Sequence, residues 1–130
     1  IYENNEQFIK DLETLHKSIS VAHDDFFTST ISMTELDIIC SSNLESKIVK
    51  HFKDKPKVVN GNLAGVGVSF SPAVFGTPNI FFSLLSVTAR AQINIEELVS
   101  TPTELVFVVH EKDFAKTVAL FSELHREVNK

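Results

Sequence analysis

The segment Ile80-Phe81-Phe82-Ser83-Leu84-Leu85-Ser86-Val87 repeats the apolar spacing of Phe8-Ile9-Lys10-Asp11-Leu12-Glu13-Thr14-Leu15, which lies 72 positions earlier. In both segments apolar residues recur three and four positions apart. That spacing places them on one face of a helix, which is the pattern of an amphipathic helix packed on a core. The chain therefore contains a helical pattern that occurs twice.

The repeat continues into the segments that follow these helices. Residues 24–28 align with residues 96–100 at the same offset, and residues 34–36 align with residues 103–105 at an offset of 69. The change of three positions falls between two predicted strands, where the length of a turn is free to vary. An ordered set of matches of this kind indicates two copies of one helix–strand–strand–helix unit.

Apolar periodicity and breaker residues set the expected elements. Asn4 or Asn5 is a plausible N-cap of the first helix, Asn43 of the second, and Thr77 of the third, with Pro78 at its first position. The predicted helices cover residues 4–18, 43–52, 78–87 and 113–128. The predicted strands cover residues 21–28, 33–40, 63–70, 93–99 and 104–110, and a further short strand starts at Val58 and Val59, before a turn or bulge at residues 60–62.

This order of elements predicts an α+β fold made of two ferredoxin-like βαββαβ units. The first unit, residues 1–60, has a truncated opening strand, and the second unit, residues 61–130, lacks its closing strand. Because Ile1 opens the sequence without a methionine, we expect the chain to be a fragment of a longer protein.

Composition excludes several classes of function. The 130 residues are 43% apolar and 22% charged, which is typical of a globular domain rather than a disordered chain. A net charge of -5 argues against nucleic-acid binding, since phosphates require a basic surface. No apolar run is long enough for a membrane span. Cys40 is the single cysteine, so no intrachain disulfide can form and a reducing cytoplasmic location is expected.

Two short motifs carry a resemblance to a known family. Gly76-Thr77-Pro78, followed by Ile93-Asn94-Ile95-Glu96, resembles the tandem ACT domains that end aspartate kinases. Members of that family typically have, in order, a strand, a GTPG-like loop, a helix, the sequence INIE, a strand and a closing helix. The match is better over residues 63–128 than over residues 1–52. At Gln7-Phe8-Ile9 the family often has glycine, phenylalanine and leucine, so the first position departs from its pattern.

The resemblance implies a regulatory module rather than an enzyme. Tandem ACT units in that family bind an amino acid and transmit feedback inhibition to an upstream kinase domain, in the biosynthesis of lysine, threonine and methionine. The implied effector is lysine or threonine, and the implied assembly is a homodimer through ACT units. In this family the first unit is inserted into the second, so the last strand of the second unit lies upstream in sequence. The alternative hypothesis is a free-standing ACT pair with no attached kinase. A third hypothesis is a small ferredoxin-like enzyme.

A pocket for a free amino acid needs donors for its carboxylate and an anion for its ammonium group. The helix start at Asn5 offers backbone donors and a favourable dipole, and Asp24 or Asp25 offers the anion. Taken alone, the same residues are better explained as a helix cap and two solvated charges, and the resemblance raises the pocket to an equal alternative. The expected effector-binding residues are Asn5, Phe8, Ile9, Asp24, Asp25, Ser29 and Thr30, with Asn94 and Ile95 contributed by the second unit as in the resembled family.

Other chemistry finds little support in the sequence. Gly65-x-Gly67 lacks the third glycine of a phosphate-binding loop and lies within a predicted strand. A close approach of another backbone segment, or a bulge, explains these two glycines better. Apart from His51-x-x-Asp54 at a helix end, the five histidines lack metal-ligand spacing, so no metal site is expected. Neither a catalytic residue nor a cofactor is expected. Gly76-Thr77-Pro78-Asn79 is read as a helix start rather than a second effector loop.

Overall fold

The first helix begins where Asn5 caps it. In the computed structural model, which describes residues 1–74 and 78–128, the Asn5 side chain accepts a hydrogen bond of 3.0 Å from the Phe8 backbone N–H. Helix α1 (Glu6–Ser18) then buries Phe8, Leu12 and Leu15 on one face, as the spacing predicts. The predicted helix and one of its two candidate caps are confirmed.

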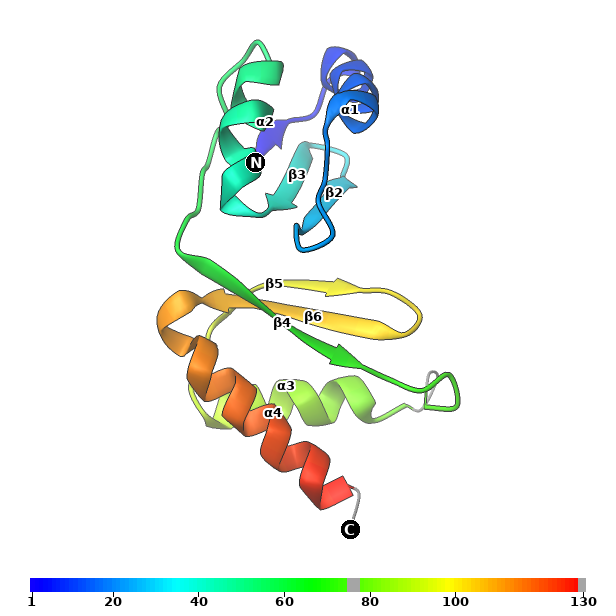
Figure 1. Cartoon of the computed structure of the whole chain (residues 1–130), viewed down its shortest axis with the longest axis vertical. Helices are drawn as coiled ribbons and strands as arrows, with labels where there is room; N and C mark the ends of the chain where they lie inside the picture. The colour runs from blue at the N-terminus through cyan, green and yellow to red at the C-terminus, as the bar shows by residue number, and fades with distance from the viewer. Residues whose placement is uncertain (75–77, 129–130) are drawn as a thin grey trace. The chain divides into compact units, whose positions relative to one another are not determined.

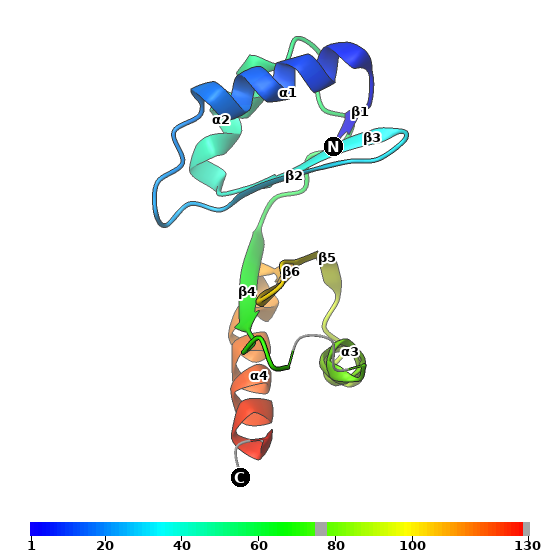
Figure 2. The ribbon, with the colours of Figure 1, turned by 90° about the vertical axis from the view of Figure 1, so that its right-hand side faces the viewer.

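The chain divides into two compact units, Ile1–Gly61 and Asn62–Lys130 (Figure 1). The first contains β1 (Tyr2–Glu3), α1, β2 (Phe27–Ile31), β3 (Glu35–Cys40), a 3-10 turn (Ser42–Leu44) and α2 (Glu45–His51). Its sheet is antiparallel with strand order β1-β3-β2. Both helices lie over one face of that sheet (Figure 2).

Two local predictions are wrong where Asp25 makes its hydrogen bonds. The strand expected over residues 21–28 begins only at Phe27, because Asp25 closes a turn by accepting from the Ala22 N–H at 3.0 Å. Asn43 does not cap α2. It lies in the 3-10 turn and donates to the Asp25 carboxylate at 3.0 Å.

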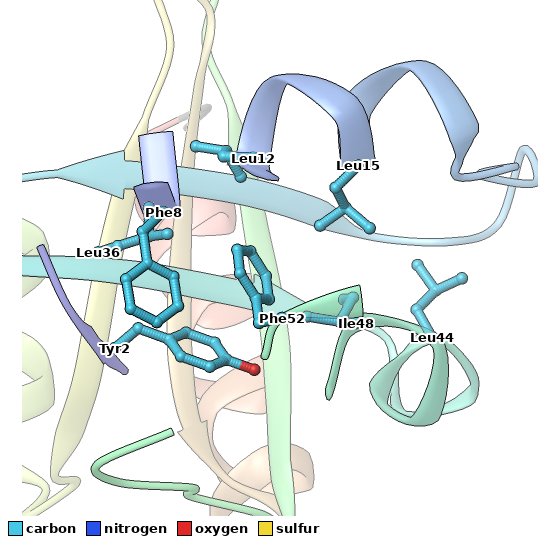
Figure 3. Close-up of a cluster of buried hydrophobic side chains, with 8 residues drawn as sticks. All are labelled: Tyr2, Phe8, Leu12, Leu15, Leu36, Leu44, Ile48 and Phe52. Atoms are coloured by element: carbon cyan, nitrogen blue, oxygen red, sulfur yellow. The ribbon is translucent and has the colours of Figure 1, made fainter. Parts of the chain in front are cut away.

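Three aromatic rings form the centre of the first core (Figure 3). The Phe52 ring lies 4.6 Å from the Tyr2 ring and 5.3 Å from the Phe8 ring, measured between centroids. Burial, and to a lesser degree Cys40, raises the pKa of Tyr2 above its usual value, so the hydroxyl stays neutral at ordinary pH. The buried core of this unit consists of Tyr2, Phe8, Leu12, Leu15, Leu36, Leu44, Ile48 and Phe52.

The expected strand at Val58 and Val59 is not formed. These residues are 52% and 61% exposed, and the strand of that region is β4 (Leu63–Ser69). The backbone nevertheless pairs with the chain start: the Ile1 amino group donates to the Val58 carbonyl at 2.8 Å, and the Lys57 N–H donates to the Ile1 carbonyl at 2.7 Å. This pairing lies beside β1, where the fourth strand of a βαββαβ sheet belongs.

The second unit repeats the plan of the first. It contains β4, α3 (Ile80–Arg90), β5 (Ile95–Ser100), β6 (Glu104–His110), a 3-10 turn (Glu111–Asp113) and α4 (Phe114–Val128). Its antiparallel sheet has the order β4-β6-β5, and α3 and α4 cover one face (Figures 1 and 2). Its buried core consists of Val66, Leu84, Ile93, Leu105, Phe107, Val109 and Phe121. The predicted α+β, ferredoxin-like fold is confirmed.

The start of α3 differs from the prediction. The helix begins at Ile80, so Pro78 lies in the preceding turn and not at the first helical position. The expected cap, Thr77, and the neighbouring Gly76 lie outside the described residues.

Strand β5 contains a bulge next to its two glutamates. Ile95 pairs with Val109 and Glu97 pairs with Val108, so two steps along β5 match one step along β6. Leu98 consequently pairs with Phe107, whose side chain is completely buried. In a regular ladder Glu97 would take that place and direct its carboxylate toward the core.

Helix α3 ends in a Schellman motif. The Gln92 N–H donates to the Ala89 carbonyl at 3.0 Å, and the Ile93 N–H donates to the Thr88 carbonyl at 3.0 Å. The motif requires a left-handed backbone at Gln92, whose φ is 56°. Glycine is the residue that adopts this conformation without a steric penalty.

Gln92→Gly is therefore expected to stabilise the second unit by about 1 kcal/mol. The gain comes from removing a Cβ from a left-handed position. Thermal unfolding measures it, with Gln92→Ala as the control because alanine retains the Cβ. Equal melting temperatures for the glycine and alanine variants would contradict the strain assigned to this position.

Candidate functional site

The start of α1 is tied to the turn between β2 and β3. The Asn4 N–H donates to the Thr34 carbonyl at 2.9 Å, and the Asn4 side-chain amide donates to the Ser32 carbonyl at 2.6 Å. Within that turn, the Ser32 hydroxyl accepts from the Glu35 N–H at 3.0 Å. These contacts fix a polar loop beside the N-terminus of the helix.

This end of the first unit suits a small carboxylate. The Phe8 N–H donates to the Asn5 side chain, whereas the N–H groups of Glu6 and Gln7 lie in the first turn, where an α-helix offers them no backbone acceptor. The positive end of the helix dipole favours an anion there. Ile9 in the first turn of α1 is 39% exposed, and Ile31 at the end of β2 is 48% exposed, so apolar surface is present at the same end.

The predicted acids lie at the other end of α1. The helix has 13 residues, which separates its ends by about 18 Å, and the chain passes from its far end into the loop that contains Asp24 and Asp25 (Figure 2). Asp24 is fully exposed, and its Oδ1 atom lies 3.4 Å from Nδ1 of His23. Both carboxylate oxygens of Asp25 already accept hydrogen bonds, from the Ala22 N–H and from Asn43. One copy of the unit does not bring these acids to the Asn5 end.

Ser29 and Thr30 point to opposite faces of the first sheet, because successive strand residues alternate. Ser29 pairs with Ile38, which packs on the core, and its hydroxyl lies 3.2 Å from His16 Nε2 on α1. Thr30 pairs with Asp37 on the other face. Only Ser29 is directed toward α1.

The two apolar residues of the predicted pocket differ in burial. Phe8 is 5% exposed and belongs to the aromatic core, so it anchors the start of α1 to that core. Ile9 stands beside it and is accessible. Of the two, Ile9 is the one whose side chain reaches the surface at this end of the unit.

The remaining predicted residues belong to the second unit. The Asn94 amide donates to the Glu96 carboxylate at 2.7 Å, and Ile95 opens β5 and packs on the core. Sequence reasoning missed Asn4, Ser32 and Thr34, although a polar Ser-Met-Thr turn between two strands was a usable signal.

Within the described ranges, no group of three or more histidine, cysteine, aspartate or glutamate side chains is arranged to hold a metal ion. The described helices are also all too short or too polar to cross a bilayer.

No protein family model and no curated protein matches the chain. Solved structures do match it. The regulatory subunit of aspartate kinase from Thermus thermophilus superposes with a TM-score of 0.68 at 11% identity, over 94% of this chain and 86% of that chain. The fold is that of the aspartate kinase regulatory subunit.

Two further structures carry the same tandem ACT fold. A chain from a structure of aspartokinase alpha and beta subunits matches 100% of this chain and 90% of its own length, with a TM-score of 0.70 and 11% identity. Aspartate kinase from Clostridium acetobutylicum matches 90% of this chain at 15% identity and a TM-score of 0.66, but only 28% of that protein is covered. At these identities the likeness establishes the ACT architecture and its order of elements.

Proposed function

We propose that this chain is a regulatory module that binds an amino acid and controls an aspartate kinase. The observation that carries the proposal is the extent of the structural match. Both units together correspond to 86% of the aspartate kinase regulatory subunit and to 90% of a chain from a structure of aspartokinase alpha and beta subunits. A single ferredoxin-like unit would be weak support, since that fold hosts many functions. Two units in the same order over the whole chain are much more specific.

In this role residues 1–60 and 61–130 act as the first and second ACT units, and neither performs catalysis. The partner is a kinase domain upstream in sequence, and the effector is lysine or threonine, an end product of the pathway that the kinase begins. An effector that binds one arrangement of the module more tightly shifts the attached kinase toward that arrangement. Feedback inhibition follows from that differential affinity.

We place the effector pocket between two copies of the first unit. Within one copy, α1 is about 18 Å long, and Asp24 and Asp25 follow its far end. A homodimer through ACT units can bring the Asn5 end of one copy to the acids of the other. The effector carboxylate then binds the helix start, its ammonium group faces Asp24, and Ile9 contacts its aliphatic part. Ser29, Thr30, Asn94 and Ile95 stay peripheral candidates, and Phe8 supports the helix start from the core.

Calorimetric titration of lysine and of threonine into the full chain tests this pocket. Asp24→Asn together with Asp25→Asn is expected to weaken binding by about 1–3 kcal/mol, the cost of losing a charged partner. Because Asp25 also holds Asn43, the matched control is Asn43→Ala, which breaks the same contact and leaves both charges in place. Asp24→Asn alone should cause most of this loss of affinity. Its effect would not come from lost structure, since Asp24 has no structural role beyond its exposed contact with His23.

Two outcomes would count against this assignment. Equal affinity of the wild type and the double variant would remove Asp24 and Asp25 from the site. If the folded wild type binds neither amino acid, lysine and threonine are both excluded as the effector. Control of a kinase is tested separately, by adding the chain to an aspartate kinase assay with and without lysine or threonine.

The match also supports the alternative of a free-standing ACT pair. Two matched chains are only slightly longer than this one, since it covers 86% and 90% of them. A module of this size can therefore exist as a chain of its own. Amino-acid binding without any effect on kinase activity would favour this alternative.

A further inference from the structure

Residues 59–61, here called the connector, lead from the first unit into the second (Figure 1). On one side of the connector the Val58 carbonyl accepts from the Ile1 amino group at 2.8 Å, and on the other side the Asn62 carbonyl accepts from the Glu111 N–H at 2.8 Å. The connector itself belongs to no helix or strand. It is therefore a short segment of irregular backbone between two attached ends.

The connector contains an asparagine followed by a glycine. Asn60-Gly61 is the only such pair in the chain, and every other asparagine precedes a larger residue. A tight hairpin turn would explain the pair, because such turns need a positive φ. The φ of Gly61 is outside the left-handed region, and a Cβ added there would meet no atom within 4 Å. Neither the backbone conformation nor the available space explains the glycine.

Asparagine is a thermolabile residue, because the backbone nitrogen of the next residue can attack its side-chain carbonyl. Glycine at that next position favours the attack, since it has no Cβ to obstruct the approach and has the widest range of backbone conformations. The Gly61 N–H makes no hydrogen bond within residues 1–74 and 78–128, and the residue is exposed. The attacking nitrogen is therefore accessible in the folded chain.

We propose that Asn60 deamidates spontaneously in the folded protein. A base from solvent removes the proton of the Gly61 nitrogen, which forms a bond to Cγ of Asn60. The bond between Cγ and the side-chain nitrogen breaks, and this nitrogen takes a proton from water and leaves as ammonia. The product is a cyclic imide that contains the Gly61 nitrogen and both carbonyl groups of residue 60.

Water then opens the imide in one of two ways. Attack at Cγ leaves an aspartate and an ordinary backbone, whereas attack at the backbone carbonyl carbon leaves an isoaspartate, in which the chain runs through the side chain. In either case one water is consumed and one ammonia is released, and a neutral amide is replaced by a carboxylate that is charged at neutral pH. Isoaspartate also adds one carbon to the backbone of the connector.

The reaction changes the segment that leads from one unit to the other. Both ends of the connector are attached, so the added carbon and the added charge must be accommodated within residues 59–61. Because the released ammonia is lost to solvent, the converted fraction rises with the age of the molecule. This modification is separate from the effector pocket and does not rest on amino-acid binding.

Mass spectrometry of the full chain during incubation at mildly alkaline pH tests the proposal. The peptide that contains Asn60 should gain the mass difference between an amide and an acid, and it should separate into two products of equal mass. The rate should rise with pH, because the Gly61 nitrogen must lose its proton. Asn62 is the internal control, since it is also exposed but precedes Leu63, and it should keep its amide.

Gly61→Ala is the matched variant. Alanine fits at this position without a clash, and circular dichroism checks that the variant folds. Its Cβ and its narrower backbone freedom should slow the conversion of Asn60 at least about tenfold. A synthetic peptide of residues 57–63 supplies the rate without any fold. Since the folded chain also retains the contacts of Asn60, the comparison with the peptide measures how far folding slows the reaction.

The folded chain should convert within about tenfold of the peptide rate, because an exposed segment outside helices and strands opens at little cost in free energy. A larger difference between the chain and the peptide would show that the fold protects Asn60, and it would overturn the proposal. Equal rates in the wild type and in Gly61→Ala would exclude attack by an accessible Gly61 nitrogen. Equal conversion at Asn60 and Asn62 would exclude any role of the glycine.

Discussion

Replacing Phe107 with alanine is expected to unfold the second unit or to lower its melting temperature by at least about 15 °C. Phe107 lies on β6, the central strand of its sheet, and its side chain is completely buried. Its ring is 4.8 Å from that of Phe121 on α4, so it joins the sheet to the helix layer. Truncating a buried phenylalanine costs about 3–5 kcal/mol, which is a large share of the stability of so small a unit.

Hydrogen exchange of the variant measures where the loss occurs. The amides of β4, β5 and β6 should lose protection, while those of α1 should keep it, because the two cores are separate clusters. Phe82→Ala is the matched control, since it removes the same side chain from a position that is 70% exposed. A shift of only a few degrees for Phe107→Ala, or an equal shift for both variants, would contradict the core assigned to this unit.

Phe52→Ala should have a comparable effect on the first unit. Phe52 is 4% exposed and its ring contacts both Tyr2 and Phe8, so its removal opens a cavity in the middle of the aromatic cluster. The expected cost is again about 3–5 kcal/mol. Since the first unit has fewer residues than the second, we expect it to be unfolded at physiological temperature.

Tyr2 provides the measurement for this variant. It is the only tyrosine, the chain has no tryptophan, and its ring touches Phe52. The tyrosine band in near-ultraviolet circular dichroism therefore reports on the first unit alone. Phe52→Ala should abolish that band, Phe107→Ala should preserve it, and Met33→Ala, at a 97% exposed position, should leave it unchanged. A full tyrosine band in Phe52→Ala would show that the cluster does not hold the unit together.

The sequence was sufficient for the elements that local chemistry determines. Asn5 was one of two predicted caps and does start α1. The apolar run of residues 105–109, which follows the turn at residues 100–102, was predicted as a strand over the residues that form β6. The sequence repeat alone predicted two ferredoxin-like units in tandem. These features depend on residues close together in the chain, which is why periodicity detects them.

Features that depend on contacts across the fold were missed. The strand expected at residues 21–28 starts late because Asp25 binds Ala22 and Asn43, and the Asn43 contact joins residues 18 positions apart. The sequence did not show, for a similar reason, that Asn5 and Asp24 lie at opposite ends of α1 within one copy. The opposite directions of Ser29 and Thr30, however, follow from strand alternation and could have been recognised from the sequence.

The bulge in β5 gives this strand a spare residue. If Glu96 were deleted, Ile95 would still pair with Val109, Glu97 with Val108 and Leu98 with Phe107, and the ladder would become regular without exchanging its faces. Related chains can therefore differ in length by one residue inside this strand and keep the same core. An alignment that permits gaps only in loops would misplace the residues of β5 on one side of the bulge in such a chain, so an alignment of relatives should permit a one-residue gap at this position.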